Sequence, residues 1–461
     1  MSAGLQAALV SAVGSAHVTT DPDERAGSEV DWIGRRWGEA VAVVHPADVV
    51  EVVDVLLACA AHGAQVVVQG GNTGLSGGGV PGGGEVLLST TRLSQVAALD
   101  PVFGEVTVGA GARLADVRRA TLAQGWDVGV DLASRDSATI GGMVATNAGG
   151  LRVLRHGSMK AQLLGVRAVL ADGRVIDRLT GPSKDSSGYD LTSLLAGSEG
   201  TLAVVTDVRL RLVPVLPRGA TAILGLDTVD QASALVRRLV GTMNSLQAAE
   251  VVLGEAMDFL CAELDRPLPL ADPAPVYLLL DCAAANDPTT ELLAVIGELD
   301  TGDAVVASDR AGRARLWEYR ERQSEVAGAR GTPIKLDIAL PLPVIDSELA
   351  AITAAVRSLA PDAVLVVFGH LAEGNLHVNI VGPDLQEEPL TAAVLGIVAA
   401  AGGSISAEHG IGRAKLDWLP LTRSAADVAA MAALKRAWDP SGLLAPGVLF
   451  PAGAVSLDRP F

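Results

Sequence analysis

The chain has 461 residues, of which 49% are hydrophobic and 19% charged; this balance excludes a disordered protein and allows two or three domains, each with its own core. The formal net charge of −18 disfavours nucleic acid and anionic membrane surfaces as partners, and no apolar run is long enough for an integral membrane span. Three cysteines without metal or redox spacing suit a reducing compartment, and the N-terminus lacks the basic region of a signal peptide, so we expect a cytoplasmic protein.

The first elements form a small α/β unit. Residues 40–46 read as a strand that ends at Pro46, and residues 47–62 have apolar side chains at helical spacing and stop at Gly63. A second strand follows at 66–68. The order strand, helix, strand is typical of an α/β layer.

A glycine-rich loop interrupts the next pair of strands, at 66–68 and 86–88, with nine glycines from Gly70 to Gly84. Glycine at this density lets backbone N–H groups turn toward one point, which makes an anion-binding nest. Asn72, Thr73 and Ser76 add side-chain donors, so the loop predicts a phosphate or pyrophosphate site. It is not a Walker loop, since no Gly-Lys-Ser/Thr follows. The alternative is a flexible surface loop.

Two more glycine-punctuated segments follow. Residues 138–159 read ATIGGMVATNAGGLRVLRHGSM, where glycine pairs flank a helical turn of small residues. Small side chains there allow a flat ligand to approach the backbone, and Thr146 and Asn147 could bond it; the alternative is tight helix packing against a sheet. A hairpin at 163–176 turns at Asp172-Gly173, and LLAGSEGTL at 194–202 leads into a strand at 204–212.

The composition changes at Pro214 and Pro217, where the series of glycine loops also ends. Such a change predicts a domain boundary. We therefore divide the chain into domains 1–216 and 217–461. Strands and helices alternate in the second domain, which predicts an α+β fold there.

A second chemical signal lies in the C-terminal half, in VLVVFGHLAEGNLHVNI (364–380) and SAEHGIG (406–412). A hairpin with a tight turn would bring His370 and His377 together, and the downstream turn supplies Glu408 beside His409. Two imidazoles and a carboxylate suit a three-ligand metal site with open positions for substrate, which leaves His409 as a base beside the metal. The alternative is a polar, hydrogen-bonded corner.

Residues 309–330 read as a helix that presents Arg313, Trp317, Arg320 and Ser324 on one face. Lys335 follows in a strand at 334–340. These cations and the hydroxyl favour an anionic substrate, although the helix taken by itself is more typical of a solvated face than of a site.

Five motifs in order carry a resemblance that spans nearly the whole chain: QGGNTGLSGG, ATIGGMVATNAGGLRVLRHG, LLAGSEGTL, FGHLAEGNLHVNI and SAEHGIG. Together they resemble the FAD-linked D-2-hydroxyacid dehydrogenases of the vanillyl-alcohol-oxidase superfamily, in the D-2-hydroxyglutarate and D-lactate dehydrogenase branches. The resemblance implies an α+β protein with a PCMH-type FAD-binding domain of two α/β subdomains and a C-terminal cap that carries the substrate site.

The resemblance also implies the activity: oxidation of a D-2-hydroxy acid to the 2-oxo acid, assisted by a divalent metal, with a histidine base and hydride transfer to flavin N5. Zn²⁺ is the metal we expect. The glycine loop contains no histidine, so FAD is expected to bind without a covalent link through it. A glycolate-type oxidase and a non-catalytic flavin-binding partner subunit are the alternatives.

Residue by residue, the matched motifs assign roles to positions of this chain. His409 matches the position of the family's catalytic base. The positions of the family's metal ligands are matched by His370, His377 and Glu408. Substrate contacts fall on Arg320, Ser324, Lys335 and Asn379. The FAD contacts fall on Gly70, Gly71, Asn72, Thr73, Gly74, Leu75, Ser76, Gly142, Thr146, Asn147, Gly149, Gly150, Glu199 and Gly200.

The family pattern further implies an electron acceptor other than a nicotinamide cofactor, such as an electron-transfer flavoprotein or a quinone. Whether the protein forms a homodimer is left open by the sequence. Ser324 stands where the hydroxyglutarate enzymes have threonine, which keeps the hydroxyl and changes its fit to a distal carboxylate.

Overall fold

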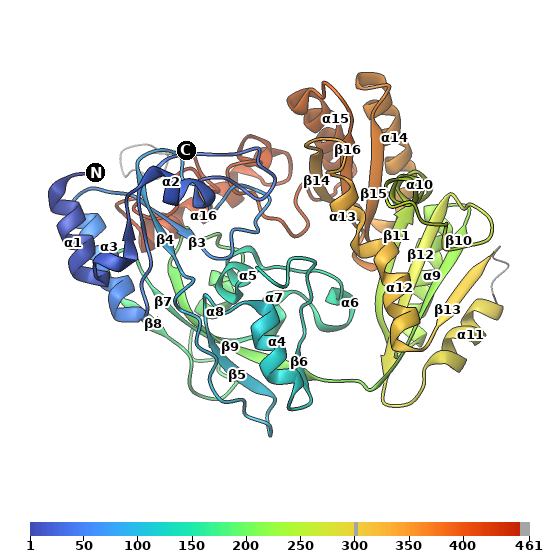
Figure 1. Cartoon of the computed structure of the whole chain (residues 1–461), viewed down its shortest axis with the longest axis horizontal. Helices are drawn as coiled ribbons and strands as arrows, with labels where there is room; N and C mark the ends of the chain where they lie inside the picture. Colours follow the sequence, from blue (N-terminus) through green and yellow to red (C-terminus); the bar gives the residue numbers. More distant parts are fainter. Residues whose placement is uncertain (299–302, 452–461) are drawn as a thin grey trace. The chain divides into compact units, whose positions relative to one another are not determined.

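The computed structural model describes residues 1–298 and 303–451, and it divides the chain into two compact units (Figure 1). The first unit comprises Met1–Gly149, His156–Val215 and the segment from Glu408 onward; the second comprises Gly150–Arg155 and Leu216–Ala407. The division expected from the sequence assigned everything after residue 216 to the second domain. The segment after Ala407 instead joins the first unit, where Leu444 pairs with Val66 in a parallel bridge.

The first unit contains a four-stranded sheet in the order β1-β2-β4-β3. Its strands are β1 (Val18–Thr19), β2 (Ala40–Val44), β3 (Val66–Gln69) and β4 (Glu85–Ser89). Both β2 and β3 run parallel to β4, and helix α3 (Val49–Ala61) connects β2 to β3. The carboxylate of Asp48 accepts the N–H groups of Val50 and Glu51 and so begins this helix. The predicted strand-helix-strand unit is confirmed.

A second sheet of the first unit is antiparallel and has the order β5-β9-β7-β8, with β6 paired to β9. Its strands are β5 (Glu105–Gly109), β6 (Trp126–Val128), β7 (Leu163–Val169), β8 (Val175–Asp177) and β9 (Val204–Pro214). The predicted hairpin at 163–176 is β7–β8.

The helices around these two sheets include several short ones. They are α1 (Ala3–Val13), α2 (Pro22–Arg25), α4 (Leu114–Leu122), α5 (Ile140–Thr146), α7 (Met159–Gln162), α8 (Leu191–Leu195) and α16 (Ala425–Trp438). Helix α6 (Val153–His156) crosses a sequence boundary between the units, since residues 153–155 belong to the second unit. Five 3₁₀ turns lie along the chain, at Ser15–His17, Ala26–Ser28, Leu342–Val344, Leu371–Glu373 and Leu416–Leu421, among the described residues.

The second unit is built on one seven-stranded antiparallel sheet in the order β13-β10-β12-β11-β15-β16-β14. Its strands are β10 (Arg218–Leu226), β11 (Leu246–Leu253), β12 (Val276–Ala284), β13 (Ala304–Ala307), β14 (Ile334–Ala339), β15 (Val364–His370) and β16 (Asn375–Val381). Its helices are α9 (Val229–Thr242), α10 (Gly254–Glu263), α11 (Thr289–Gly297), α12 (Arg310–Glu321), α13 (Gln323–Val326), α14 (Ile345–Leu359) and α15 (Glu387–Ala400).

Helices α10 and α12 pack on the sheet face that carries Val252 and Phe368, where they form an apolar core. The single helix predicted at 309–330 is wrong in one respect: α12 ends at Glu321, and α13 begins after a break at Arg322. Ser324 lies in α13 and is exposed, so it does not continue the face of Arg313, Trp317 and Arg320. No helix among residues 1–298 and 303–451 is long and apolar enough to cross a membrane.

Candidate active site

The strand register of the second unit places a group of polar side chains on one face of β14, β16, β15 and β11. Directly paired residues of antiparallel strands share a face, and the pairing here sets Asp337 beside His377 and His370 beside Glu250. We call this group the polar face; its members are Lys335, Asn379, Asp337, His377, Asn375, His370 and Glu250. The imidazole rings of His370 and His377 are edge to face with centroids 5.4 Å apart, as the predicted hairpin requires.

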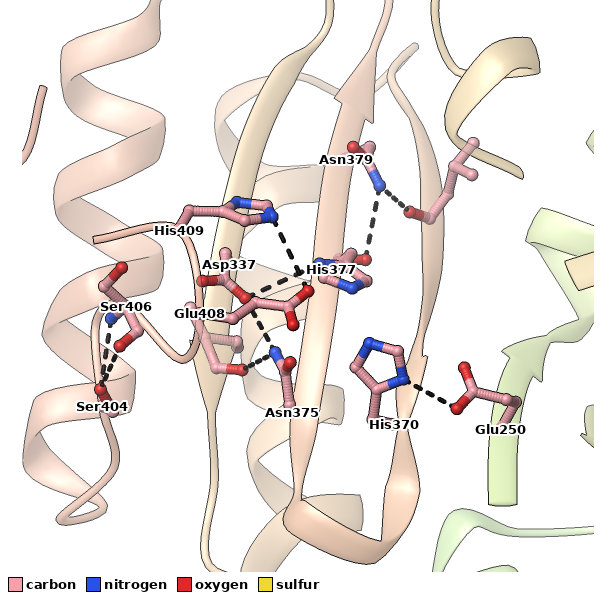
Figure 2. Close-up of polar contacts among 12 residues, drawn as sticks. Glu250, Asp337, His370, Asn375, His377, Asn379, Ser404, Ser406, Glu408 and His409 are labelled. Atoms are coloured by element: carbon pink, nitrogen blue, oxygen red, sulfur yellow. Dashed lines mark hydrogen bonds and ion pairs between the residues drawn. The ribbon is translucent and has the colours of Figure 1, made fainter. Parts of the chain in front are cut away.

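Glu250 is fully buried and joins two of the predicted site residues. Its Oε1 lies 2.7 Å from Nδ1 of His370 (Figure 2), and its Oε2 accepts a 2.7 Å hydrogen bond from Nε of Arg320. Burial raises the pKa of Glu250, but the attraction of His370 and Arg320 outweighs burial and lowers it overall, so the carboxyl group is ionised. The sequence analysis missed Glu250; a lone acid inside the apolar strand 248–253 was its only signal.

Asp337 is a second buried carboxylate that the sequence analysis missed. It is fully buried, accepts a 2.8 Å hydrogen bond from Nδ2 of Asn375, and has Oδ1 3.7 Å from Nδ1 of His377 (Figure 2). A buried polar group needs such hydrogen-bond partners. Its sequence signal was the same as that of Glu250, because Asp337 is the only acid in strand 334–340.

Two of the predicted substrate residues, Asn379 and Lys335, lie at the other end of the polar face, where they are paired across β16 and β14. Nδ2 of Asn379 donates to the carbonyl of Val366 at 3.0 Å, and the ammonium group of Lys335 lies 3.4 Å from the carbonyl oxygen of Ser324. Burial lowers the pKa of Lys335. A partly desolvated ammonium group of this kind gains from an anionic ligand.

Glu408 and His409 belong to the first unit, and they begin at the residue directly after the second unit ends. Nε2 of His409 lies 3.9 Å from Oε1 of Glu408. The carbonyl oxygen of His409 accepts a 2.9 Å hydrogen bond from the hydroxyl of Ser76, which lies in the glycine loop after β3.

The first two glycine segments of the first unit lie against each other. A Cβ atom on Gly70 would come within 2.1 Å of Oγ1 of Thr139, and one on Gly71 within 1.8 Å of the carbonyl oxygen of Ser137. Only glycine permits this approach. The structure thus brings the segment 69–78 next to the start of α5.

Thr139 is a further residue that the sequence analysis passed over, although it lies inside the second glycine segment. It precedes α5 at the position where a hydroxyl usually caps a helix, yet it makes no capping bond. Its buried Oγ1 has no hydrogen-bond partner in the part of the chain that the structure describes. An orphaned hydroxyl between two glycine segments fits a polar ligand such as a nucleotide cofactor.

Three of the predicted polar side chains of these segments, Asn72, Thr146 and Asn147, make hydrogen bonds within the protein. Asn72 donates to the carbonyl of Val30 at 2.9 Å, and Oδ1 of Asn147 accepts from the Ser158 hydroxyl and the Lys160 N–H at 2.9 Å each. The hydroxyl of Thr146 donates to the carbonyl of Gly142. Asn72 and Asn147 both have φ of 50°, a conformation that helps backbone N–H groups to converge. The backbone is therefore the main donor that these loops offer to a phosphate.

Two family models match the chain. A "FAD binding domain" model matches residues 40–178, and a model described as "FAD linked oxidases, C-terminal domain" matches residues 217–449. The first covers the first two glycine segments and the β7–β8 hairpin, and it ends before the turn at 194–202. The second covers the polar face and the 406–412 motif.

Several curated proteins are similar over most of their length. A D-2-hydroxyglutarate dehydrogenase of Xanthomonas citri pv. viticola is 35% identical over 457 residues, which are 96% of this chain and 96% of that protein. The mitochondrial D-2-hydroxyglutarate dehydrogenase of Danio rerio is 35% identical over 93% of this chain and 81% of its own length. A putative mitochondrial D-lactate dehydrogenase of Schizosaccharomyces pombe is 31% identical over 93% and 85%.

Solved structures share the fold at low identity. A p-cresol methylhydroxylase with substrate bound has a TM-score of 0.79 at 15% identity and covers 99% of this chain and 97% of its own. A 4-ethylphenol oxidase from Gulosibacter chungangensis has a TM-score of 0.74 at 17% identity, with 98% of each chain covered. These likenesses confirm the predicted α+β architecture with a PCMH-type FAD-binding fold. With the family models and the relatives at 35% identity, they show that the chain belongs to the FAD-linked oxidases, in the group that includes D-2-hydroxyglutarate dehydrogenase.

Proposed function

We propose that this protein is an FAD-dependent dehydrogenase that oxidises a D-2-hydroxy acid, of the D-2-hydroxyglutarate or D-lactate type, to the 2-oxo acid. The names of its relatives support this substrate class. The observation that carries the proposal is the polar face of the second unit, which gathers two imidazoles, two buried carboxylates and Lys335, and to which Arg320 of α12 is bonded through Glu250.

Arg320 and Lys335 would hold the substrate carboxylate. The guanidinium of Arg320 is fixed by Glu250 and lies over the ring of Phe368, 4.5 Å from its centroid, so its orientation is set before an anion arrives. A planar guanidinium suits a carboxylate better than an ammonium group does. Asn379 would complete the substrate contacts, whereas Ser324 is exposed and lies off the face that carries Arg320.

His370, His377 and Glu408 would hold a divalent metal, for which imidazole and carboxylate donors suit Zn²⁺. The donor set fits, because Glu250 accepts at Nδ1 of His370 and so leaves Nε2 as the ligand nitrogen. Asp337 lies beside His377 on the polar face and offers a further carboxylate donor for such an ion. When bound, the metal would lower the pKa of the substrate hydroxyl.

FAD would be held by the glycine segments, with Thr139 as an added hydroxyl. The contacts would come from Gly70–Ser76, Gly142, Thr146, Asn147, Gly149, Gly150, Glu199 and Gly200. It supplies the hydride acceptor, while the protein binds and orients. His409 would take the C2 hydroxyl proton on a ring nitrogen as general base. The electron acceptor, the cytoplasmic location and the oligomeric state stay predictions.

Anaerobic flavin bleaching tests the proposal. Purified protein would be titrated with D-2-hydroxyglutarate, D-lactate, D-malate and glycolate while the oxidised-flavin absorbance is followed. We expect selective bleaching by one D-acid, its loss after chelation, and its return when a divalent metal is added. A yellow protein that no hydroxy acid bleaches would contradict the proposal and favour the flavin-binding subunit. Peroxide release in air would instead indicate an oxidase.

The base is tested by the variant His409→Asn, which should keep FAD and lower the bleaching rate by ~10²-fold or more, as expected when a general base is lost. The matched control is His62→Asn, since His62 is an exposed histidine at the end of α3. Equal rates in the two variants would remove His409 from the mechanism.

A further inference from the structure

The backbone that follows His409 is fixed by a carboxylate of another loop. Oε1 of Glu199 accepts the N–H of Ile411 at 2.9 Å, and Oε2 accepts the N–H of Gly412 at 2.7 Å. Glu199 is buried and has φ of 50°, a conformation that is uncommon for a residue with a side chain. Surrounding contacts must therefore hold it there, and both of its oxygens are used by this loop.

Ser76 fixes the same loop from a second direction. Its hydroxyl donates to the carbonyl of His409 at 2.9 Å, and its own carbonyl accepts the N–H groups of Arg413 and Ala414 at 3.0 Å each. Gly412 has φ of 54°, and a Cβ atom there would come within 2.1 Å of the Ser76 carbonyl oxygen. The loop thus approaches Ser76 as closely as a residue without a side chain allows.

These contacts fix the backbone at His409 and directly after it. Ser76 holds the peptide unit of His409 itself, while Glu199 holds the two amides that lie two and three residues further on. The family pattern places both residues next to FAD, yet the hydrogen bonds of their side chains go to this loop. All of these contacts lie inside the first unit.

We propose that Glu199 and Ser76 are positioning residues that fix the imidazole of His409 relative to the flavin-binding loops. The proposal rests on the proposed function, in which His409 is the base. A base must be held within a fraction of an ångström of the proton that it takes, and a displacement of ~1 Å can cost ~10²-fold in rate. The two loops that bind the cofactor would thereby also set the catalytic base.

The test uses the FAD-loaded, full-length protein with Glu199→Gln and Ser76→Ala. In Glu199→Gln the amide NH₂ faces one of the two loop N–H groups, so one hydrogen bond is lost with little change in shape. We expect a bleaching rate about 10-fold lower in each variant. The FAD-to-protein ratio and the KM for the D-acid should stay within about 2-fold of the wild type. Amide hydrogen exchange across 408–414 should become faster.

Glu51→Gln is the matched control, since Oε2 of Glu51 also accepts a backbone N–H, that of Ala47, in the same unit. It should leave the bleaching rate and the exchange of 408–414 unchanged. The double variant Glu199→Gln/His409→Asn should bleach no more slowly than His409→Asn alone, because a residue that acts through His409 has no effect once the imidazole is gone.

The outcomes separate this proposal from the proposed function. If His409→Asn is slow but Glu199→Gln and Ser76→Ala bleach at the wild-type rate, the positioning role is overturned. Additive losses in the double variant would overturn it too, since Glu199 would then act on the flavin directly. If no D-acid bleaches the wild type, the proposed function fails, and unchanged exchange of 408–414 in both variants would show separately that these residues do not hold the loop.

Discussion

Glu250 lies between an imidazole and a guanidinium in the interior of the second unit, and it fixes the orientation of both groups. Its hydrogen bond to Nδ1 fixes which nitrogen of His370 carries the proton, and its bond to Nε fixes the plane of the Arg320 guanidinium. A buried ion pair contributes little net stability compared with apolar residues of the same size. Removing one partner destabilises the protein, because the other charge is then left buried and unpaired.

Glu250→Gln should therefore lower the free energy of unfolding by about 3 kcal/mol, measured by urea denaturation. It should also weaken metal binding by ~10-fold in competition with a chelator, because the neutral amide no longer fixes the tautomer of His370. Glu263→Gln breaks a more exposed pair with Arg330 and serves as the control, with a cost below about 1 kcal/mol. Wild-type stability and metal affinity in Glu250→Gln would contradict this role.

The hairpin β15–β16 is the element that brings the two histidines of the polar face together. Its turn passes through Gly374, which has φ of 68° and lies where a Cβ atom would meet the carbonyl oxygen of Leu340 at 2.1 Å. The N–H of Leu340 donates to the carbonyl of Gly374, so the turn is also tied to the end of β14. The positions of His370, His377 and Asp337 thus depend on one residue without a side chain.

We expect Gly374→Ala to cost about 2 kcal/mol or more in thermal or urea unfolding, since both the backbone conformation and the contact with Leu340 oppose a methyl group. The KM for the D-acid should rise as well. Gly396→Ala is the control, because Gly396 is an exposed position inside α15 with no atom near the added methyl group, and alanine there should stabilise the helix by up to ~1 kcal/mol. If Gly374→Ala leaves both the free energy of unfolding and the KM unchanged, the turn tolerates a side chain.

At the level of elements, the sequence predicted what local pattern encodes. Alternating apolar residues located β15 and β16, and their separation by one tight turn predicted that His370 and His377 meet. Glu250 and Asp337 could not be found in this way, because a lone acid in an apolar strand has no periodicity to mark it. The break at Arg322 was also missed, since apolar and charged residues keep helical spacing across it.

The first unit is discontinuous along the chain, and this could not be predicted from composition. Its last segment returns to β3, where the N–H of Val66 donates to the carbonyl of Leu443 and the N–H of Ala445 to that of Val66. No local pattern predicts a pairing between residues so far apart in the sequence. The returning segment is organised by Lys435, which is 3% exposed and donates to the carboxylate of Asp439 and to the carbonyl oxygens of Thr201 and Leu444.

Lys435→Met tests whether this segment supports the cofactor loop that follows β3. Methionine keeps the length and apolar stem of lysine, but it leaves the buried carboxylate of Asp439 without its cation, so we expect a loss of about 3 kcal/mol in unfolding free energy. Because β3 leads directly into the glycine loop, the FAD-to-protein ratio of the purified variant should fall as well, and added FAD should restore part of the lost stability. Lys184→Met, at an exposed site of the same unit, should change neither quantity. A destabilised Lys435→Met that retains full FAD would mean that the segment stabilises the unit without shaping the cofactor loop.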